Sequence, residues 1–264
     1  MKINDEKTYN TAIKDIAGLK DFSLIFNIIN LHFSEPDSTD SKITDDNEFD
    51  IRASKTRTKV SWAINKSILQ FVSDEHKDLV AQVFQESIPL QDKKFAFLWH
   101  LCLNNRLIRE ITINVFTKVY FSGRAQISQD DIIAYIKNLS DKNDPSTPNW
   151  SEETLYRVST KYLSLMTKFD FVTSGRVKSF YLIRPSSEAL VLFLYFSSLF
   201  VPKTKNILAS VLLPASFIAK EDIQERLKKL SLKGFFDMSF NGVALNVELT
   251  HSYKEVCNAL YSRS

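Results

Sequence analysis

Basic and hydroxyl side chains recur on one face of the segment 152–168 and continue just beyond it. The candidate residues are Arg157, Thr160, Lys161, Lys168, Arg176 and Lys178. On a helix, those within the segment lie opposite an apolar stripe with alternating spacings of three and four residues. Guanidinium and ammonium groups neutralise phosphate, and hydroxyl groups hydrogen-bond to base edges or phosphate oxygens. The pattern favours contact with nucleic acid; the alternative is an ordinary solvated helix face.

The elements around these residues follow the order of a winged helix-turn-helix unit. Ser128 begins a capping pattern that predicts a helix over 129–139. A stretch with two prolines over 141–149 follows, then the helix over 152–168 and a hairpin over 171–183 as the wing. An α-helix fits the major groove of duplex DNA, and basic wing residues reach the backbone or the minor groove. The linker is longer than the three- to four-residue turn of a tight helix-turn-helix.

The C-terminal segment repeats the order of helix and hairpin. A helix is expected to begin at Ala219, and Lys228, Lys229 and Lys233 lie near its end. These three lysines either bind phosphate or are favoured there by the helix dipole, which stabilises cations near a C-terminus. A closing helix is expected over 252–261.

The hairpin of this segment is predicted over 235–249. The sequence alternates with period two around Asn241 and Gly242, a pair typical of a two-residue turn with positive φ at both positions. In this register Phe240 faces Val243. The same register predicts that all the apolar strand residues share one face.

The expected fold class is mainly α with small β-hairpins, a helical bundle with winged-helix-like units. Apolar residues at spacings of three and four predict helices through most of the N-terminal half. The predicted units are an N-terminal helix over 1–33, an acidic linker over 34–51, a helical bundle over 52–127, a winged-helix-like unit over 128–200 and a helix-hairpin-helix unit over 201–264.

Charge is unevenly distributed along the 264 residues. Residues 1–50 carry 5 basic and 11 acidic side chains, whereas the whole chain has a net charge of +3. The remainder is therefore strongly basic, as a body that attracts a polyanion would be. A third basic cluster, at Arg52, Lys55, Arg57 and Lys59, directly follows the acidic stretch. This cluster either contacts nucleic acid or pairs with the carboxylates of residues 1–50, which we call the acidic arm.

Catalytic patterns are scarce in the sequence. Glycine-rich phosphate loops, the G-x-S-x-G elbow and the H-E-x-x-H zinc motif are absent from the 264 residues. His100 and Cys102 point to different sides of a helix, so we expect His100 to be a core residue and not a metal ligand. We therefore expect no enzymatic activity, cofactor, metal or small-molecule substrate.

Composition indicates a globular protein of the cytoplasm. Hydrophobic residues make up 44% of the chain, enough to form a core. The longest apolar run, 189–201, is interrupted by two serines and is shorter than the roughly 20 residues of a membrane span. Two cysteines do not suffice for a disulfide scaffold, so we expect a reducing compartment and no membrane association.

Two stretches of the sequence resemble the BrxA family of bacterial BREX phage-defence systems. They are FAFLWHLCLNNRLIREITINVFTKVYFSGRAQISQDDIIAYI and WSEETLYRVSTKYLSLMTKFDFVTSGRVKSF, the second opening with Trp150, Ser151 and Thr154. The resemblance covers roughly residues 52–264 and is smallest in the acidic arm. It implies a mostly helical, non-enzymatic protein that binds double-stranded DNA and acts with other BREX proteins. RNA binding, or a role as a protein-interaction scaffold, are the alternatives.

Overall fold

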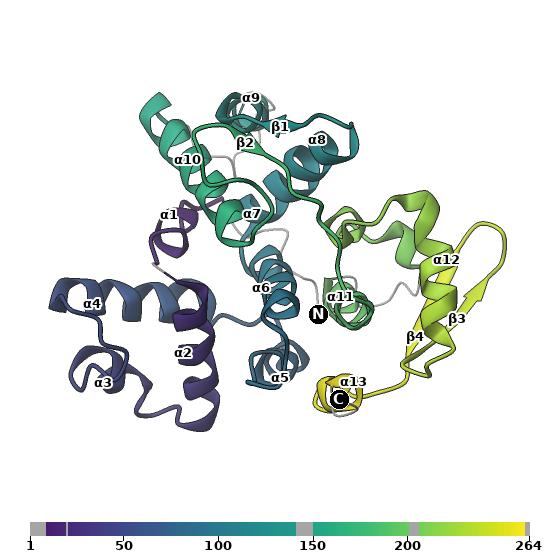
Figure 1. Cartoon of the computed structure of the whole chain (residues 1–264), viewed down its shortest axis with the longest axis horizontal. Coiled ribbons are helices and arrows are strands. Elements are labelled where there is room, and N and C mark those ends of the chain that lie inside the picture. Colours follow the sequence, from purple (N-terminus) through teal and green to yellow (C-terminus); the bar gives the residue numbers. More distant parts are fainter. Residues whose placement is uncertain (1–8, 20, 141–149, 201–205, 262–264) are drawn as a thin grey trace.

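The computed structural model describes residues 9–19, 21–140, 150–200 and 206–261. These residues are mainly helical and include two small antiparallel sheets of two strands each (Figure 1). The expected fold class is confirmed. None of the helices in these ranges combines the length and the apolar character needed to cross a membrane.

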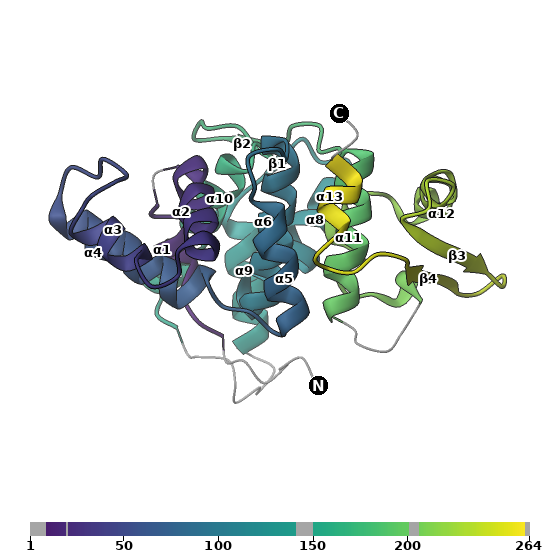
Figure 2. The same cartoon turned by 90° about the horizontal axis from the view of Figure 1, so that it is seen from below.

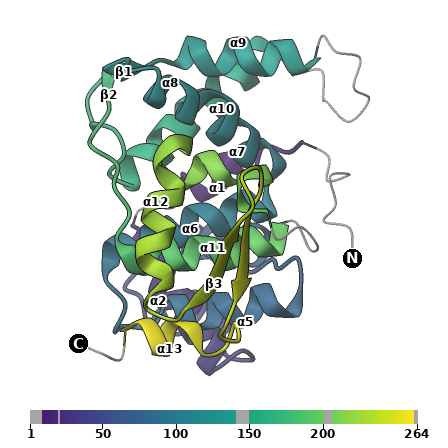
Figure 3. The same ribbon diagram turned by 90° about the vertical axis from the view of Figure 1, so that its right-hand side faces the viewer.

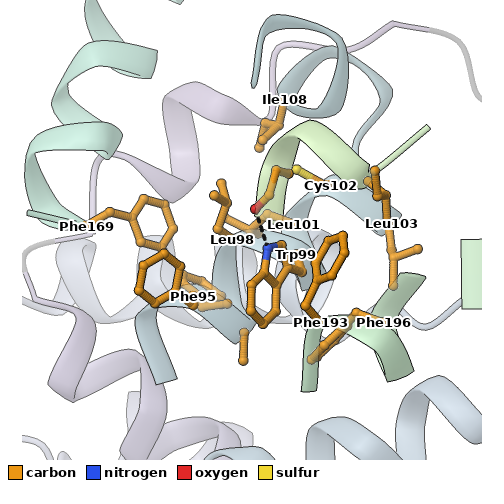
Figure 4. Close-up of a cluster of buried hydrophobic side chains, with 14 of the residues drawn as sticks. Phe95, Leu98, Trp99, Leu101, Cys102, Leu103, Ile108, Phe169, Phe193 and Phe196 are labelled. Atoms are coloured by element: carbon orange, nitrogen blue, oxygen red, sulfur yellow. Dashed lines mark hydrogen bonds between the residues drawn. The ribbon is translucent and has the colours of Figure 1, made fainter. Parts of the chain in front are cut away.

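Helix α6 (Leu90–Asn104) occupies the centre of the core. Every residue from Phe95 to Asn104 is buried, and α6 packs against α11 (Ser187–Phe200) and α5 (Asp74–Val83). The indole of Trp99 contacts rings from α6 and α11 and donates a hydrogen bond of 2.8 Å to a buried carbonyl (Figure 4).

The N-terminal part differs from the predicted single helix and linker. The helix breaks into α1 (Ile13–Ile16) and α2 (Phe22–Ser34), because the Asp21 carboxylate accepts a hydrogen bond from the Ser23 amide and starts a new helix. The acidic stretch 34–51 is not a plain linker, since it contains α3 (Thr39–Thr44).

The acidic stretch is held by both charge and apolar packing. Lys42 forms ion pairs with Glu35 and Glu48, and Ile43 is buried. Helix α4 (Ser54–Ala63) follows and continues into a π-helical turn. Figure 2 shows α3 and α4 at one end of an elongated molecule.

The middle of the chain contains the predicted helices around the wing. They are α7 (Arg106–Ile111), a π-helical turn (Thr112–Phe116), α8 (Thr117–Phe121), α9 (Gln129–Ser140) and α10 (Glu152–Lys168). The Ser128 capping pattern is confirmed, because the side chains and amides of Ser128 and Asp131 bond reciprocally. The linker predicted over 141–149 lies outside the described residues.

The two sides of the predicted wing hairpin pair with each other, and a third segment that was not predicted joins them. Strand β2 (Lys178–Ser179) pairs with β1 (Gln126–Ile127), a two-residue strand ahead of α9. The partner expected for β2, residues 171–173, forms one bridge, between Val172 and Phe180. The wing is therefore the edge of a small sheet to which three chain segments contribute.

The C-terminal part lies at the other end of the molecule, seen face-on in Figure 3. It contains α12 (Lys220–Ser231), β3 (Phe236–Phe240), β4 (Leu245–Leu249) and α13 (Val256–Tyr261), after short 3-10 turns at Ile207–Ala209 and Leu213–Ser216. The closing helix begins four residues later than predicted.

The β3–β4 hairpin forms, but the predicted register is wrong by two residues. Phe240 pairs with Leu245 instead of Val243, so four residues form the turn. The reason is the Asn241 side chain, whose Oδ1 accepts hydrogen bonds from the amides of Val243 and Ala244. The shift by an even number keeps the apolar strand residues on one face.

Candidate nucleic-acid interface

Helix α10 is fixed in place by its apolar stripe and by a cap. Leu155, Val158 and Tyr162 are buried, and the Ser151 hydroxyl accepts a hydrogen bond from the Thr154 amide at the start of the helix. The polar face is thereby turned outward, as the spacing of the residues predicted.

Two predicted residues in the middle of this face differ in how far their side chains are accessible to a ligand. Arg157 is exposed and pairs with Glu153 one turn earlier, at 2.5 Å. Thr160 is half-buried; its hydroxyl donates to the Tyr156 carbonyl and accepts from Gln129 Nε2 at 2.7 Å. Thr160 therefore joins α10 to α9, whereas Arg157 remains accessible to solvent.

Lys161 and Lys168 lie on the same side of α10 but have different environments. Lys161 is half-buried, and among the described residues its ammonium has no hydrogen-bond or ion-pair partner. The Lys168 ammonium donates to the carbonyls of Ala17 and Leu19. Burial lowers the pKa of Lys168, and Lys161 lowers it further. Lys168 thus attaches the end of α1 to α10 and is not turned toward solvent.

The wing loop shows the same contrast between its two predicted cations. The Lys178 ammonium donates to Thr167 Oγ1 and to the Thr173 carbonyl, each at 3.1 Å, and to the Ser174 carbonyl at 3.3 Å. Burial lowers the pKa of Lys178. Arg176 is exposed at the loop tip without a partner within the described ranges. Lys178 therefore closes the loop against α10, and Arg176 projects from it.

The single ridge of cations expected over residues 157–178 does not form. Lys168 and Lys178 bind carbonyl oxygens, whereas the other three predicted cations of this region make no such bond within the described residues. We call these three, Arg157, Lys161 and Arg176, the α10 face. Sequence reasoning identified the helix face but not the direction of the two long side chains: Lys168 binds backbone distant along the chain, and Lys178 binds the backbone of its own loop.

The remaining predicted residues lie on α12, in another part of the molecule (Figure 1). Lys228 is exposed without a described partner, and Lys229 pairs with Glu225 at 2.6 Å. A groove of about 480 Å³ separates α12 from the segment after the wing. Lys229 lines this groove together with Arg184 and Arg226, which the sequence analysis missed.

The groove beside α12 has mixed charge, because Asp222 and Glu225 also line it. Arg184 and Arg226 are far apart in sequence, and only the fold brings them together. We call Arg184, Arg226, Lys228 and Lys229 the α12 patch. The α10 face and the α12 patch are two surfaces and not one.

His100 is buried and hydrogen-bonded, as predicted for a core histidine. Its Nδ1 lies 2.9 Å from Nε2 of His76, and its Nε2 lies 2.7 Å from the Ile68 carbonyl. Since Nδ1 of His76 accepts a hydrogen bond from the Val72 amide, both neutral rings carry their proton on Nε2. In the part of the chain that the structure describes, three or more His, Cys, Asp or Glu residues do not gather as metal ligands.

Comparison with known proteins finds one family. The BrxA family model matches residues 7–190, which is more than half of the chain. The match includes the acidic segment, where the resemblance was expected to be smallest, and ends within α11, before the C-terminal unit. No curated protein matches the chain.

Proposed function

The chain belongs to the BrxA family and is thus a component of a BREX phage-defence system, and on this premise we propose that it binds double-stranded DNA through the α10 face. The α12 patch provides a second, weaker contact. The proposed role is binding without catalysis, with other BREX proteins as further partners.

The order of elements supports the interpretation of the DNA-binding unit as a winged helix. Helix α8, strand β1, helices α9 and α10, and the two wing segments follow one another along the chain. Strand β1 pairs with β2, and Val172 bridges to Phe180, so the wing is attached beside α10. In helix-turn-helix proteins the second helix enters the major groove.

One hydrogen bond carries the proposal. The Lys178 ammonium bonds to Thr167 Oγ1, and Thr167 is a half-buried residue of α10. This bond holds the wing loop against α10, the helix that carries Arg157 and Lys161, and on this ground we expect Arg176 at the loop tip to face the same duplex. Three cations from two elements then face one duplex.

The carboxylates at the start of α10 define how the duplex approaches. Glu152 and Glu153 are exposed in the first turn of the helix and repel phosphate. The pair between Arg157 and Glu153 is exposed on both sides, and such pairs contribute roughly 0.3–0.5 kcal/mol. Phosphate therefore competes well for Arg157, and we expect the backbone to contact the middle of α10.

The test is the triple variant Arg157→Glu, Lys161→Glu, Arg176→Glu. Fluorescence anisotropy with a labelled 20-bp duplex should show loss of binding, while the helical circular dichroism is unchanged. In a plot of log K against log salt, the three phosphates neutralised by the α10 face contribute about −3 to the slope of the natural chain, and any contact by the α12 patch adds to it. The charge-matched control changes Lys66, Lys77 and Lys254 to Glu on other exposed surfaces and should bind as before.

Two outcomes would refute the proposal. If the triple variant retains binding, the α10 face is not the site. If duplex RNA or a single strand of matched sequence binds more tightly than duplex DNA, the ligand is wrong. Changing Lys228 and Lys229 to Glu should weaken binding less than the triple variant does.

A further inference from the structure

A groove of about 1080 Å³ lies at the end of the molecule formed by α4 (Figure 2). Its walls are the junction of α1 and α2, the segment 49–53 and one side of α4. Its apolar lining comes from Leu19, Leu24, Phe49, Ile51, Val60 and Trp62. We call it the α4 groove. The activity proposed above does not use it.

The basic cluster predicted at the start of α4 divides into an inward and an outward part. The Arg57 guanidinium donates to the carbonyls of Thr44 at 2.7 Å and Ile51 at 3.1 Å. Asn47 Oδ1 accepts a hydrogen bond from the Ile51 amide at 2.8 Å. These bonds hold the acidic segment against α4, so the wall of the groove is preformed.

The outward cations line the groove and are unpaired. Lys55 and Lys59 lie on α4, and Lys14 and Arg52 lie across from them. Within the described ranges none of the four has an ion-pair or hydrogen-bond partner. Some other exposed cations, such as Arg124 and Lys229, are paired with carboxylates. These four are therefore available to a ligand.

An exposed tryptophan completes the lining. Trp62 is 51% exposed and lies on the same stripe of α4 as Lys55 and Lys59, at spacings of four and three residues. Exposed aromatic side chains beside a rim of charge are typical of protein interfaces, and tryptophan is enriched among the residues that contribute most to binding.

The charge of the groove favours a protein segment over a nucleic acid. Asp15, Asp21 and Asp50 line it together with the four cations. A duplex has a phosphate at every step and meets these carboxylates unfavourably. A peptide places its charges singly, so its carboxylates can meet the lysines while an apolar side chain covers the tryptophan.

We propose that the α4 groove binds an acidic, amphipathic segment of a partner protein. A bulky apolar side chain of this segment packs on Trp62, and flanking carboxylates pair with Lys55 and Lys59. The groove is thus an interaction surface separate from the α10 face.

The test uses the full chain and a fluorescein-labelled 15-residue peptide. The peptide has two leucines and a phenylalanine on one helical face and glutamates at most other positions. One control peptide has lysines in place of the glutamates, and another has alanines in place of the apolar residues. We expect the first peptide to bind, and both controls to bind at least about tenfold more weakly.

Variants assign the binding to the groove. Trp62→Ala and the pair Lys55→Glu, Lys59→Glu should each weaken binding of the peptide at least about tenfold. Lys66→Glu is the matched control, because Lys66 is exposed one turn beyond Trp62 and does not line the groove; it should change binding less than about twofold. Circular dichroism verifies that each variant is folded.

The outcomes also separate this proposal from DNA binding. The groove variants should retain duplex binding, and the α10-face triple variant should retain peptide binding. The proposal is overturned if the alanine peptide binds equally well, if the groove variants bind like the natural chain, or if Lys66→Glu weakens binding as much as they do. It is also overturned if duplex DNA displaces the peptide and the groove variants lose the duplex.

Discussion

The basic side chains around α10 and those around α4 come from similar sequence patterns but have different roles in the fold. Near α10, Lys168 and Lys178 bind backbone carbonyls, and Lys168 thereby connects segments distant in sequence. Near α4, Arg57 alone does so, and Lys55 and Lys59 remain unpaired within the described ranges. Cations at regular spacing therefore indicate a basic surface, but the surrounding backbone decides which of them are available to a ligand.

The buried side chain of His100 differs most from these basic side chains, because the fold shifts its pKa strongly. Burial lowers the pKa of His100 to about 4, against the opposing effect of its hydrogen bond to the Ile68 carbonyl. The unfolded chain takes up a proton near pH 6.5, whereas the folded chain does not do so until about pH 4. The contribution of His100 to the free energy of unfolding is therefore fully present above pH 6.5. It is lost as the pH falls toward 4, by about 3 kcal/mol in all.

Denaturant unfolding between pH 7.5 and 4.5 measures this effect. His100→Phe should be less stable at pH 7.5 but should lose less stability on acidification. The difference between the two proteins isolates His100, because the carboxyl group of Asp92, whose pKa burial raises, contributes in the opposite sense in both. Parallel pH dependences would contradict the assignment.

The next largest effect is on the free energy of unfolding, and it distinguishes Lys168 from Lys161, two turns earlier on α10. Lys168→Met removes an ammonium that bonds to two carbonyls, and hydrogen bonds to charged groups contribute roughly 1.5–3 kcal/mol. We expect the free energy of unfolding to fall by about 2 kcal/mol. Lys161→Met is the control and should change it by less than about 0.5 kcal/mol. Equal losses for both variants would remove the distinction between structural and available cations.

Much of the fold could be predicted from local pattern. The capping residues and apolar spacing of α9 and α10 are contained in short windows, and these helices begin within a residue of their predicted positions. Strand β1 could not be predicted, because two residues without a pattern become a strand only by pairing with β2. The register of β3–β4 was missed because the Asn241 side chain, and not the backbone alone, shapes the turn.

The candidate site was less predictable than the fold. Periodicity identified which residues of α10 face outward, but the carbonyls that Lys168 binds are about 150 residues away in sequence. Arg184 and Arg226 likewise come together only because α12 packs beside the segment after the wing. Contacts of this kind depend on tertiary structure, which local spacing does not encode.

The smallest expected effect concerns Arg157, which pairs with Glu153 but remains accessible to a phosphate. Glu153→Gln removes the partner of Arg157 and also a repulsive charge at the start of α10. Because the pair is exposed, the free energy of unfolding should change by less than about 0.5 kcal/mol. Duplex affinity should rise about threefold at low salt, and the gain should shrink at high salt because exposed charges are screened. An unchanged affinity would mean that the backbone of the duplex does not pass beside Arg157, and the contact would then have to be assigned to the α12 patch.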